Sequence, residues 1–329
     1  MGQTEGFSEV MRVLIYGGGA VGLGIASCLL RSGVEVAIVA RPDTVAALDR
    51  TGVVRTGIFG RFDAAPGTFT CRTGLDQLES KPYDYTLVCT KSFDSAFAAA
   101  DLARHIGQVG AGMKLVLFQN GWGNAEAFRT HFAPDRIYNA RVITGFRRDR
   151  PNEVEVTVHA DAIHLGSLFD AGTGAVDRLA SAISAGGIPC RTTGDIGKDL
   201  WAKMLYNCAL NPLGAILGVT YGALAEQRTT RDIMDRIVDE VFSVMVHAGY
   251  TTHWEGPRDF LDVFYGTLVP STAGHKSSML QDILAGKRTE VDALNGAVIK
   301  LADAHGLAAP YNRTVYGLVE FVETSGNVI

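Results

Sequence analysis

One helix-like segment carries polar side chains at a spacing that suits chemistry. In LWAKMLYNCALNP (200–212), Lys203, Asn207 and Asn211 recur every four residues and therefore line one stripe of a helix. The remaining side chains are mostly apolar, which predicts that this helix is buried. An ammonium followed by two amides supplies several hydrogen-bond donors and one positive charge, which suits an anionic ligand. The structural alternative is that Lys203 extends to solvent while the asparagines cap neighbouring loops.

A second polar group lies in HKSSMLQDILAGKRTEVDALNG (275–296). Its polar side chains fall before and inside a predicted helix over 289–305, and they are Ser277, Ser278, Gln281, Asp282, Glu290, Asp292 and Asn295. The alternative here is a capping box, in which Thr289 caps the helix and Asp292 closes the box. Glu290 would then only favour the helix dipole.

The elements that must position these residues begin with a nucleotide-binding pattern. RVLIYGGGAVGLGIASCLLRSGVEVAIVAR (12–41) reads as strand, glycine turn, helix and strand. Gly17, Gly19 and Gly22 fill the GxGxxG positions, which allow a tight turn, close approach of a pyrophosphate and packing of helix on strand. The helix predicted over 20–31 directs its amino-terminal N–H groups at the phosphates. The alternative is a glycine turn that serves packing alone.

The residue after the second strand predicts which dinucleotide binds. Sites for NAD place an Asp or Glu there to hold the ribose hydroxyls, whereas this chain has Arg41. Asp43 follows, but Pro42 opens a new helix and carries it past the usual place. A cation at this position can pair with a 2′-phosphate, so the sequence favours NADPH. A solvated surface arginine is the alternative.

Further strands follow in the first half. The apolar runs 85–91 and 114–121 end in Lys91 and in Asn120, at carboxyl ends of strands where ligands bind in an open parallel sheet. A surface lysine and an Asn-Gly turn are the structural alternatives for these two positions. Alternation over 139–166 indicates an antiparallel extension at the sheet edge, and the first domain is expected to span 12–190.

The second half, 191–329, has helical periodicity throughout. The predicted fold class is α/β, with an N-terminal Rossmann-type doubly wound parallel sheet followed by an all-helical C-terminal domain. Helices are predicted at 196–217, 228–248, 256–269, 275–285, 289–305 and 312–324.

Composition excludes several other classes of protein. The 329 residues carry a net charge of −5 with no long basic run, which gives no support for binding nucleic acid or an anionic membrane. Five cysteines, an odd number without a CxxC pair, indicate buried thiols in a reducing compartment rather than a disulfide framework or a zinc site. Residues 1–11 lack the features of a signal peptide and are expected to form a disordered leader. We therefore expect a cytoplasmic protein, and the oligomeric state stays open, a homodimer included.

Five motifs together resemble one enzyme family. YGGGAVG, CTKS, FQNGWGN, LWAKMLYNCALNP and SSMLQDILAGKRTEVDALNG occur in the order and at the separations typical of the ketopantoate reductase (2-dehydropantoate 2-reductase) family. The resemblance covers residues 12 to 325, and the last two motifs are the specific ones. It implies NADPH-dependent reduction of ketopantoate to pantoate, on the route to pantothenate and coenzyme A, with a small 2-oxo acid as the partner.

The resemblance also implies roles for particular residues. Lys203 matches the catalytic lysine, and Glu290 matches a glutamate near the cofactor and that lysine. Asn207, Asn211 and Ser278 match substrate contacts. Hydride transfer to a ketone creates an alkoxide, which a lysine in a water-excluded site can protonate and stabilise. The implied cofactor contacts are Gly17, Gly18, Gly19, Ala20, Val21, Gly22, Arg41, Lys91, Asn120 and Glu290.

Two departures from the family pattern fall on the substrate side. Tyr221 stands where the family has an asparagine that contacts substrate, and His275 replaces another asparagine ahead of the paired serines. These changes leave open a relative that reduces another branched or aromatic 2-oxo acid to a D-2-hydroxy acid by the same mechanism. A non-catalytic NADP(H) sensor is a third hypothesis, and the intact Lys203 and Glu290 argue against it, because a sensor needs only the glycine loop.

Overall fold

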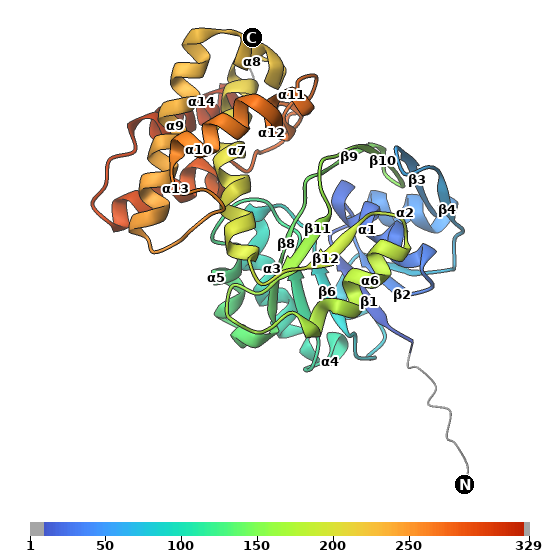
Figure 1. The fold of residues 1–329 in the computed structure, drawn as a ribbon. Helices are drawn as coiled ribbons and strands as arrows, with labels where there is room; N and C mark the ends of the chain where they lie inside the picture. The colour runs from blue at the N-terminus through green and yellow to red at the C-terminus, as the bar shows by residue number, and fades with distance from the viewer. Residues whose placement is uncertain (1–9, 326–329) are drawn as a thin grey trace. The chain divides into compact units, whose positions relative to one another are not determined.

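The computed structural model describes residues 10–325, which divide into two compact units (Figure 1). The first unit contains most of the first 194 residues. The second contains the helical half together with two short loops, 91–93 and 120–126, that leave the first unit's sheet. The predicted leader lies outside the described residues except for Val10 and Met11, and Met11 is buried in the core of the first unit.

An eight-stranded sheet forms the centre of the first unit, as the apolar strand-like runs predict (Figure 1). The strand order is β12-β11-β8-β7-β6-β1-β2-β5, and every pair is parallel except β8 with β11. The chain runs outward from β1 on both sides, so a switch point lies between β1 and β6. The strands are β1 Arg12–Tyr16, β2 Glu35–Val39, β5 Thr70–Arg72, β6 Tyr85–Val88, β7 Lys114–Leu117, β8 Ile137–Arg141, β11 Ile163–Gly166 and β12 Cys190–Thr192.

A second, four-stranded sheet corrects the prediction for 139–166. Only β8 and β11 extend the main sheet there. The two strands between them pair as a hairpin with each other and join a region for which we predicted no strands. The order is β4-β3-β10-β9, with β3 Val53–Gly57, β4 Phe62–Ala64, β9 Thr144–Arg150 and β10 Glu153–His159. Alternation along a strand identifies a buried face but not the sheet that contains it, which explains the error.

Helix α1 (Ala20–Arg31) packs against strands of both sheets. It contacts β1 and β2 of the main sheet and all four strands of the small one, so most of its side chains are buried. It ends at Arg31, and Gly33 follows at φ +80°. The other helices that begin in this half are α2 Pro42–Thr51, α3 Ser95–Arg104, α4 Ile106–Val109, α5 Asn124–Arg129 and α6 Asp177–Ala185, and 3₁₀ turns lie at Leu75–Gln77, Ser92–Asp94, Pro134–Arg136 and Gly174–Val176.

The second unit is built around α7 (Ile196–Leu217), the helix with the polar stripe (Figure 1). It contacts α8, α9, α12 and α14, which explains its apolar composition on nearly every side. Its last residue is Leu217, and Gly218 caps it at φ +70°. The surrounding helices are α8 Tyr221–Glu226, α9 Arg228–His247, α10 Pro257–Val263, α11 Val269–Ser271, α12 Ser278–Leu284, α13 Asn295–Ala304 and α14 Pro310–Ser325, with a π-helical turn at Phe264–Leu268.

Two predicted helices differ from the observed ones. The segment 275–285 becomes helical only at Ser278, because the Ser277 hydroxyl caps α12 by accepting from the Leu280 N–H. The segment 289–305 is not one helix: a 3₁₀ turn at Val291–Ala293 precedes α13. The capping box was also wrong, since the Thr289 hydroxyl accepts from the Val291 N–H. Glu290 therefore lies in a loop.

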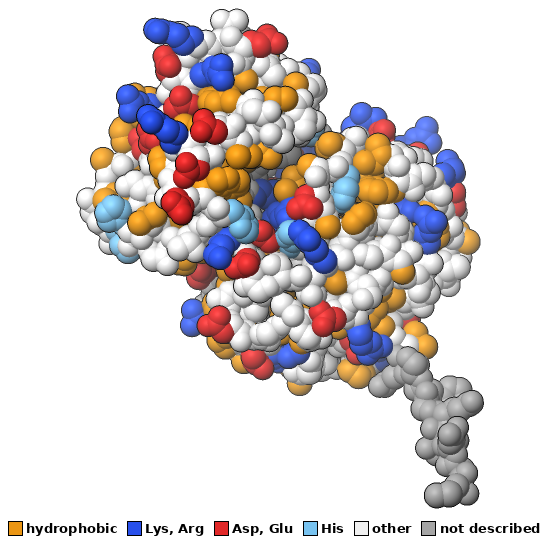
Figure 2. Space-filling model, in the orientation of Figure 1, with side chains coloured by type: hydrophobic (Ala, Val, Ile, Leu, Met, Phe, Trp, Pro, Cys, Tyr) orange, Lys and Arg blue, Asp and Glu red, His pale blue; other side chains and the backbone are white. Residues whose placement is uncertain are grey.

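The surface is consistent with the charge pattern of the sequence. On the described part of the face drawn in Figure 2, Lys and Arg side chains are interspersed with Asp and Glu. No helix within residues 10–325 is long and apolar enough to cross a membrane.

Candidate active site

The glycine loop between β1 and α1 has the shape that a dinucleotide requires. Gly17 adopts φ +115°, and a Cβ there would lie 2.8 Å from the Cys89 carbonyl carbon. A Cβ on Gly22 would lie 2.0 Å from the Gly17 carbonyl oxygen. A Cβ on Gly19, in contrast, would have the Cys89 oxygen at 3.9 Å as its nearest neighbour. The first and third glycines are thus needed by the protein itself, while the second leaves room for a ligand.

The start of α1 adds hydrogen-bond donors to this loop. No side chain caps the helix at Gly19, and its first turn contains no acidic residue. Unpaired N–H groups and the positive end of the helix dipole favour an anion there. The loop Gly17–Gly22 therefore fits the diphosphate of a dinucleotide, the group that the sequence pattern implied.

Arg41 lies at the place where a ribose would be recognised. It precedes α2 directly after β2, its side chain is exposed, and it forms no ion pair with any residue of 10–325. Asp43 is carried into the first turn of α2, as Pro42 predicted. A cation stands at the end of β2 where an NAD site has a carboxylate.

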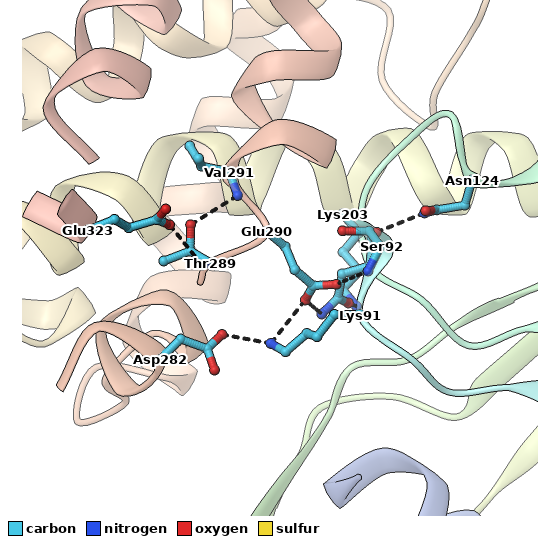
Figure 3. A network of polar contacts seen from close by, with 10 residues as sticks. Lys91, Ser92, Asn124, Lys203, Asp282, Thr289, Glu290, Val291 and Glu323 are labelled. Atoms are coloured by element: carbon cyan, nitrogen blue, oxygen red, sulfur yellow. Dashed lines mark hydrogen bonds and ion pairs between the residues drawn. The ribbon is translucent and has the colours of Figure 1, made fainter. Parts of the chain in front are cut away.

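In the second unit, a buried carboxylate collects donors from distant segments (Figure 3). Glu290 is 7% exposed. One of its oxygens accepts from the Ser92 N–H at 3.0 Å, and the other accepts from Asn120 Nδ2 at 3.3 Å and Lys91 Nζ at 3.4 Å. We call Lys91, Ser92, Asn120, Lys203, Asp282 and Glu290 the Glu290 network. A buried carboxylate needs such partners, because desolvation otherwise favours its neutral form.

Lys91 is held between two carboxylates. Its Nζ lies 2.6 Å from Asp282 Oδ2 in addition to its contact with Glu290 (Figure 3). Burial alone would lower the pKa of Lys91, but the charges of Glu290 and Asp282 outweigh it, so the pKa is raised. Burial likewise raises the pKa of Asp282, although Lys91 opposes the shift. The two carboxylates therefore favour the charged form of Lys91.

Lys203 joins the network through an amide. Its Nζ donates to Asn120 Oδ1 at 2.6 Å, while the Nδ2 of the same amide donates to Glu290. The Asn120 carbonyl accepts from Asn124 Nδ2 at 2.9 Å, which holds the loop that carries Asn120. Asn120 thus orients the lysine ammonium and links it to the buried carboxylate.

Backbone contacts explain how Asn120 reaches the helices. The Trp122 N–H donates to the Ala293 carbonyl at 2.8 Å. Gly121 adopts φ +88°, and a Cβ there would lie 2.3 Å from the same oxygen. The Trp122 ring packs against Trp201 and Tyr250, with ring centroids 4.7 Å apart in both pairs. QNG is a loop in which Gly121 adopts a positive φ, and this loop delivers Asn120 to the network.

Asn207 and Asn211, which follow Lys203 along the polar stripe, have different neighbours from the lysine. Asn207 and Asn211 are 8% and 4% exposed. Asn211 Oδ1 accepts from the Tyr221 hydroxyl at 2.7 Å, and the Asn211 carbonyl accepts from Ser277 Oγ at 3.3 Å. The Tyr221 ring lies between Tyr206 and His275, with centroids at 5.7 and 5.2 Å. We call Tyr206, Asn211, Tyr221, His275 and Ser277 the Tyr221 cluster.

Comparisons with known proteins identify the family. Residues 13–169 match the model described as "Ketopantoate reductase PanE/ApbA", and residues 195–323 match its C-terminal counterpart. The 2-dehydropantoate 2-reductase of Aquifex aeolicus is 35% identical over 95% of this chain and 97% of its own length. The chain belongs to the ketopantoate reductase family. It is an oxidoreductase that acts on CH–OH groups, in a family of NAD(P)H-dependent reductases.

Solved structures agree with this assignment. A ketopantoate reductase of the PanE/ApbA family from Ralstonia eutropha JMP134 has a TM-score of 0.83 and 28% identity, covering 96% of this chain and 99% of that one. D-mandelate dehydrogenase, solved with NADH and anilino(oxo)acetate, has a TM-score of 0.85 and covers 97% of this chain and 100% of that one. At 23% identity, the second match shows the fold alone.

The structure of this reductase brings some of the predicted site residues into contact with one another and leaves others apart. Lys91, Asn120, Lys203 and Glu290 form one connected network. Asn211, Tyr221 and His275 meet in the Tyr221 cluster. Asn207 lies between the two groups on α7, whereas Ser278 is exposed and it is its neighbour Ser277 that is buried.

Sequence reasoning missed three participants. Asp282 was noted among the polar residues but given no role, although it lies on α12 one turn after Ser278. Asn124 follows Asn120 by four residues, a spacing that suits a contact within one turn. The Ser92 contribution is a backbone N–H, which no residue type signals. Within residues 10–325, no three metal-ligating side chains cluster, and the five cysteines are free.

Proposed function

We propose that this reductase converts ketopantoate (2-dehydropantoate) to pantoate with NADPH, in the biosynthesis of pantothenate and coenzyme A. The observation that carries the proposal is the placement of Lys203, whose ammonium is oriented by Asn120 and linked through it to Glu290. Relatives named 2-dehydropantoate 2-reductase, such as the Aquifex aeolicus protein, support the substrate. In this proposal the protein works in the cytoplasm on a small molecule, without nucleic acid or membrane.

The residues of this chain supply positioning, charge and a proton. NADPH, when bound at Gly17–Gly22, supplies the hydride. Lys203 donates a proton to the ketone oxygen and stabilises the negative charge that develops on it. Asn120 holds the Lys203 ammonium in place, and Glu290 offsets the positive charge of the network. Asn207, Asn211 and Ser278 bind the substrate.

A second candidate substrate is supported by the Tyr221 cluster. The Tyr221 hydroxyl already donates to Asn211, and burial raises the pKa of this phenol, so its polar atom is engaged within the protein. An asparagine at this position would offer an amide where this chain presents an aromatic ring. This favours a 2-oxo acid with an apolar side chain, reduced by the same mechanism to a D-2-hydroxy acid.

A substrate panel separates these candidates. Purified enzyme is given NADPH and either ketopantoate, a branched aliphatic 2-oxo acid or phenylglyoxylate, and loss of NADPH absorbance gives kcat/KM for each. The highest kcat/KM with ketopantoate supports the first proposal, and a higher value with an apolar side chain supports the second. No turnover with any of them would contradict both, and binding of NADPH without turnover would support a sensor.

The choice of NADPH has its own test. Arg41→Asp should weaken NADPH far more than NADH, by a few kcal/mol at most, roughly the value of a charge-assisted contact. Dissociation constants for both cofactors measure the effect. Equal weakening of the two, or a wild-type enzyme that prefers NADH, would contradict the assignment.

A further inference from the structure

A second arginine contacts the glycine loop, although no motif in the sequence assigned it to cofactor binding. Arg148 lies on β9, an edge strand of the small sheet. Its Nη1 donates to the Gly18 carbonyl at 2.7 Å and to the Thr44 hydroxyl at 3.3 Å. Both partners belong to the nucleotide-binding half: Gly18 is inside the loop, and Thr44 is in the first turn of α2. A strand far along the chain therefore brings a cation to the loop.

Arg148 and Arg41 both contact Thr44, and Arg41 directly follows a residue that packs on Gly18. A Cβ on Gly18 would lie 2.6 Å from the Ala40 Cβ, so the loop touches the residue just before Arg41. The Thr44 N–H donates to the Arg41 carbonyl at 3.0 Å. Burial, and then the charge of Arg41, lower the pKa of the Arg148 guanidinium. The charge of Arg41 thus disfavours the cationic form of Arg148, and an anion bound by both would relieve this effect.

The other two arginines of β9 form ion pairs with carboxylates, whereas Arg148 forms none within residues 10–325. Arg147 forms ion pairs with Asp149 and Glu155, and Arg150 forms one with Glu153. Arg148 contacts only neutral oxygens among the described residues, and its Nη2 and Nε bond none of them. Nη2 and Nε, two donors that an arginine can direct at one phosphate, are thus available to a ligand.

Packing of β9 fixes the direction of Arg148. Phe146, two residues earlier and on the same face of the strand, packs on α1 so closely that a Cβ on Gly24 would lie 2.3 Å from its ring. Arg148 is therefore presented from an anchored strand rather than from a mobile loop.

We propose that Arg148 is a second specificity-determining contact for the cofactor, binding the 2′-phosphate of NADPH together with Arg41. The inference rests on the proposed use of NADPH. It adds a residue from the small sheet, about a hundred positions after Arg41, to the recognition of the adenosine ribose. A purely structural Arg148, which only braces the Gly18 carbonyl, is the competing explanation.

Calorimetric binding without substrate tests the proposal. Dissociation constants are measured for NADPH, NADH, adenosine 2′,5′-bisphosphate and AMP with the wild type, Arg148→Gln and Arg150→Gln. Arg150 lies on the same strand but is paired with Glu153, so it is the control for loss of an arginine from β9. Arg148→Gln should weaken NADPH and the bisphosphate about 10- to 100-fold, the range for a hydrogen bond to a charged group. NADH and AMP should change by less than about threefold, as should every ligand with Arg150→Gln.

The outcomes separate this inference from the proposed function. Equal weakening of NADPH and NADH would make Arg148 a structural brace or a diphosphate contact, and unchanged affinity for both cofactors would remove it from the site. Either result overturns the inference while leaving Arg41 in place. A wild type without preference for NADPH overturns both. If Arg148→Gln does not fold, Arg148→Lys keeps the charge but loses the fork, and its NADPH-to-NADH selectivity should fall by roughly 3- to 10-fold. Wild-type selectivity in that variant also contradicts the inference.

Discussion

The glycine loop of the first unit comes from one short stretch of backbone, whereas the Glu290 network of the second collects side chains from segments far apart in the chain. In the loop, tight contacts leave no space for a Cβ on Gly17 or Gly22. In the network, buried charges require one another, and Glu290 contacts residues nearly two hundred positions earlier. Backbone sterics shape the first site, and electrostatic pairing holds the second together.

This difference determines how each region tolerates change. A substitution in the loop alters shape and should act on cofactor affinity and stability. A substitution in the network removes a charge or a donor while the helices that carry it stay packed. The largest effects on turnover should therefore come from the network, and the loop should affect binding.

The strongest test of this contrast is Lys203→Ala. Turnover should fall by roughly 10²–10⁴, the usual contribution of a positioned general acid, while the dissociation constant for NADPH stays close to that of the wild type. Lys203→Arg should not restore turnover, because a guanidinium does not release its proton near neutral pH. Steady-state kinetics and cofactor titration give both quantities. Near-normal turnover in Lys203→Ala would make this lysine structural.

A second test compares two glycines of the loop. Gly22→Ala should lower the free energy of unfolding of the cofactor-free protein by about 1–3 kcal/mol, because its Cβ would overlap the Gly17 carbonyl oxygen. Gly19→Ala should leave that stability near the wild-type value, since the nearest atom would be 3.9 Å away. Both variants should bind NADPH more weakly. Chemical denaturation and calorimetry measure the two properties.

The pair separates two demands on the loop. Stability lost in Gly22→Ala but not in Gly19→Ala would assign the third glycine to the fold and the second to the ligand. Full NADPH affinity in Gly19→Ala would show that the diphosphate does not approach this backbone, which contradicts the assignment of Gly17–Gly22.

The same difference explains what the sequence could predict. The strand, loop and helix around Gly17–Gly22 are local in the chain, so period and residue type were enough. Lys91 and Asn120 were found from their place at the ends of predicted strands, but their roles and that of Glu290 came from the family resemblance, because no spacing connects the three residues. Asp282 and Arg148 were missed, since their roles depend on which element packs beside them. The small sheet was missed for the same reason: β3 and β10 are about a hundred residues apart.

The Tyr221 cluster offers the smallest expected effect and a test of whether it belongs with the loop or with the network. Burial lowers the pKa of His275 below its ordinary value, so the folded protein favours the neutral ring. His275 therefore contributes stability above its unfolded pKa, near 6.5, and that contribution is lost as pH falls through the folded value. The free energy of unfolding should decline less between about pH 7 and pH 5 in His275→Gln than in the wild type. A His131→Gln variant, at an exposed position, is the control and should keep the wild-type slope.

The His275 ring faces Tyr221, whose hydroxyl donates to Asn211. A reduced slope would therefore mean that protonation of His275 also disturbs an asparagine of the polar stripe. KM for the 2-oxo acid should then rise at low pH in the wild type more than in His275→Gln, with kcat little changed. The same pH dependence of the free energy of unfolding in both proteins would mean that folding does not change the titration of His275. The Tyr221 cluster would then shape the site through packing and would not respond to pH.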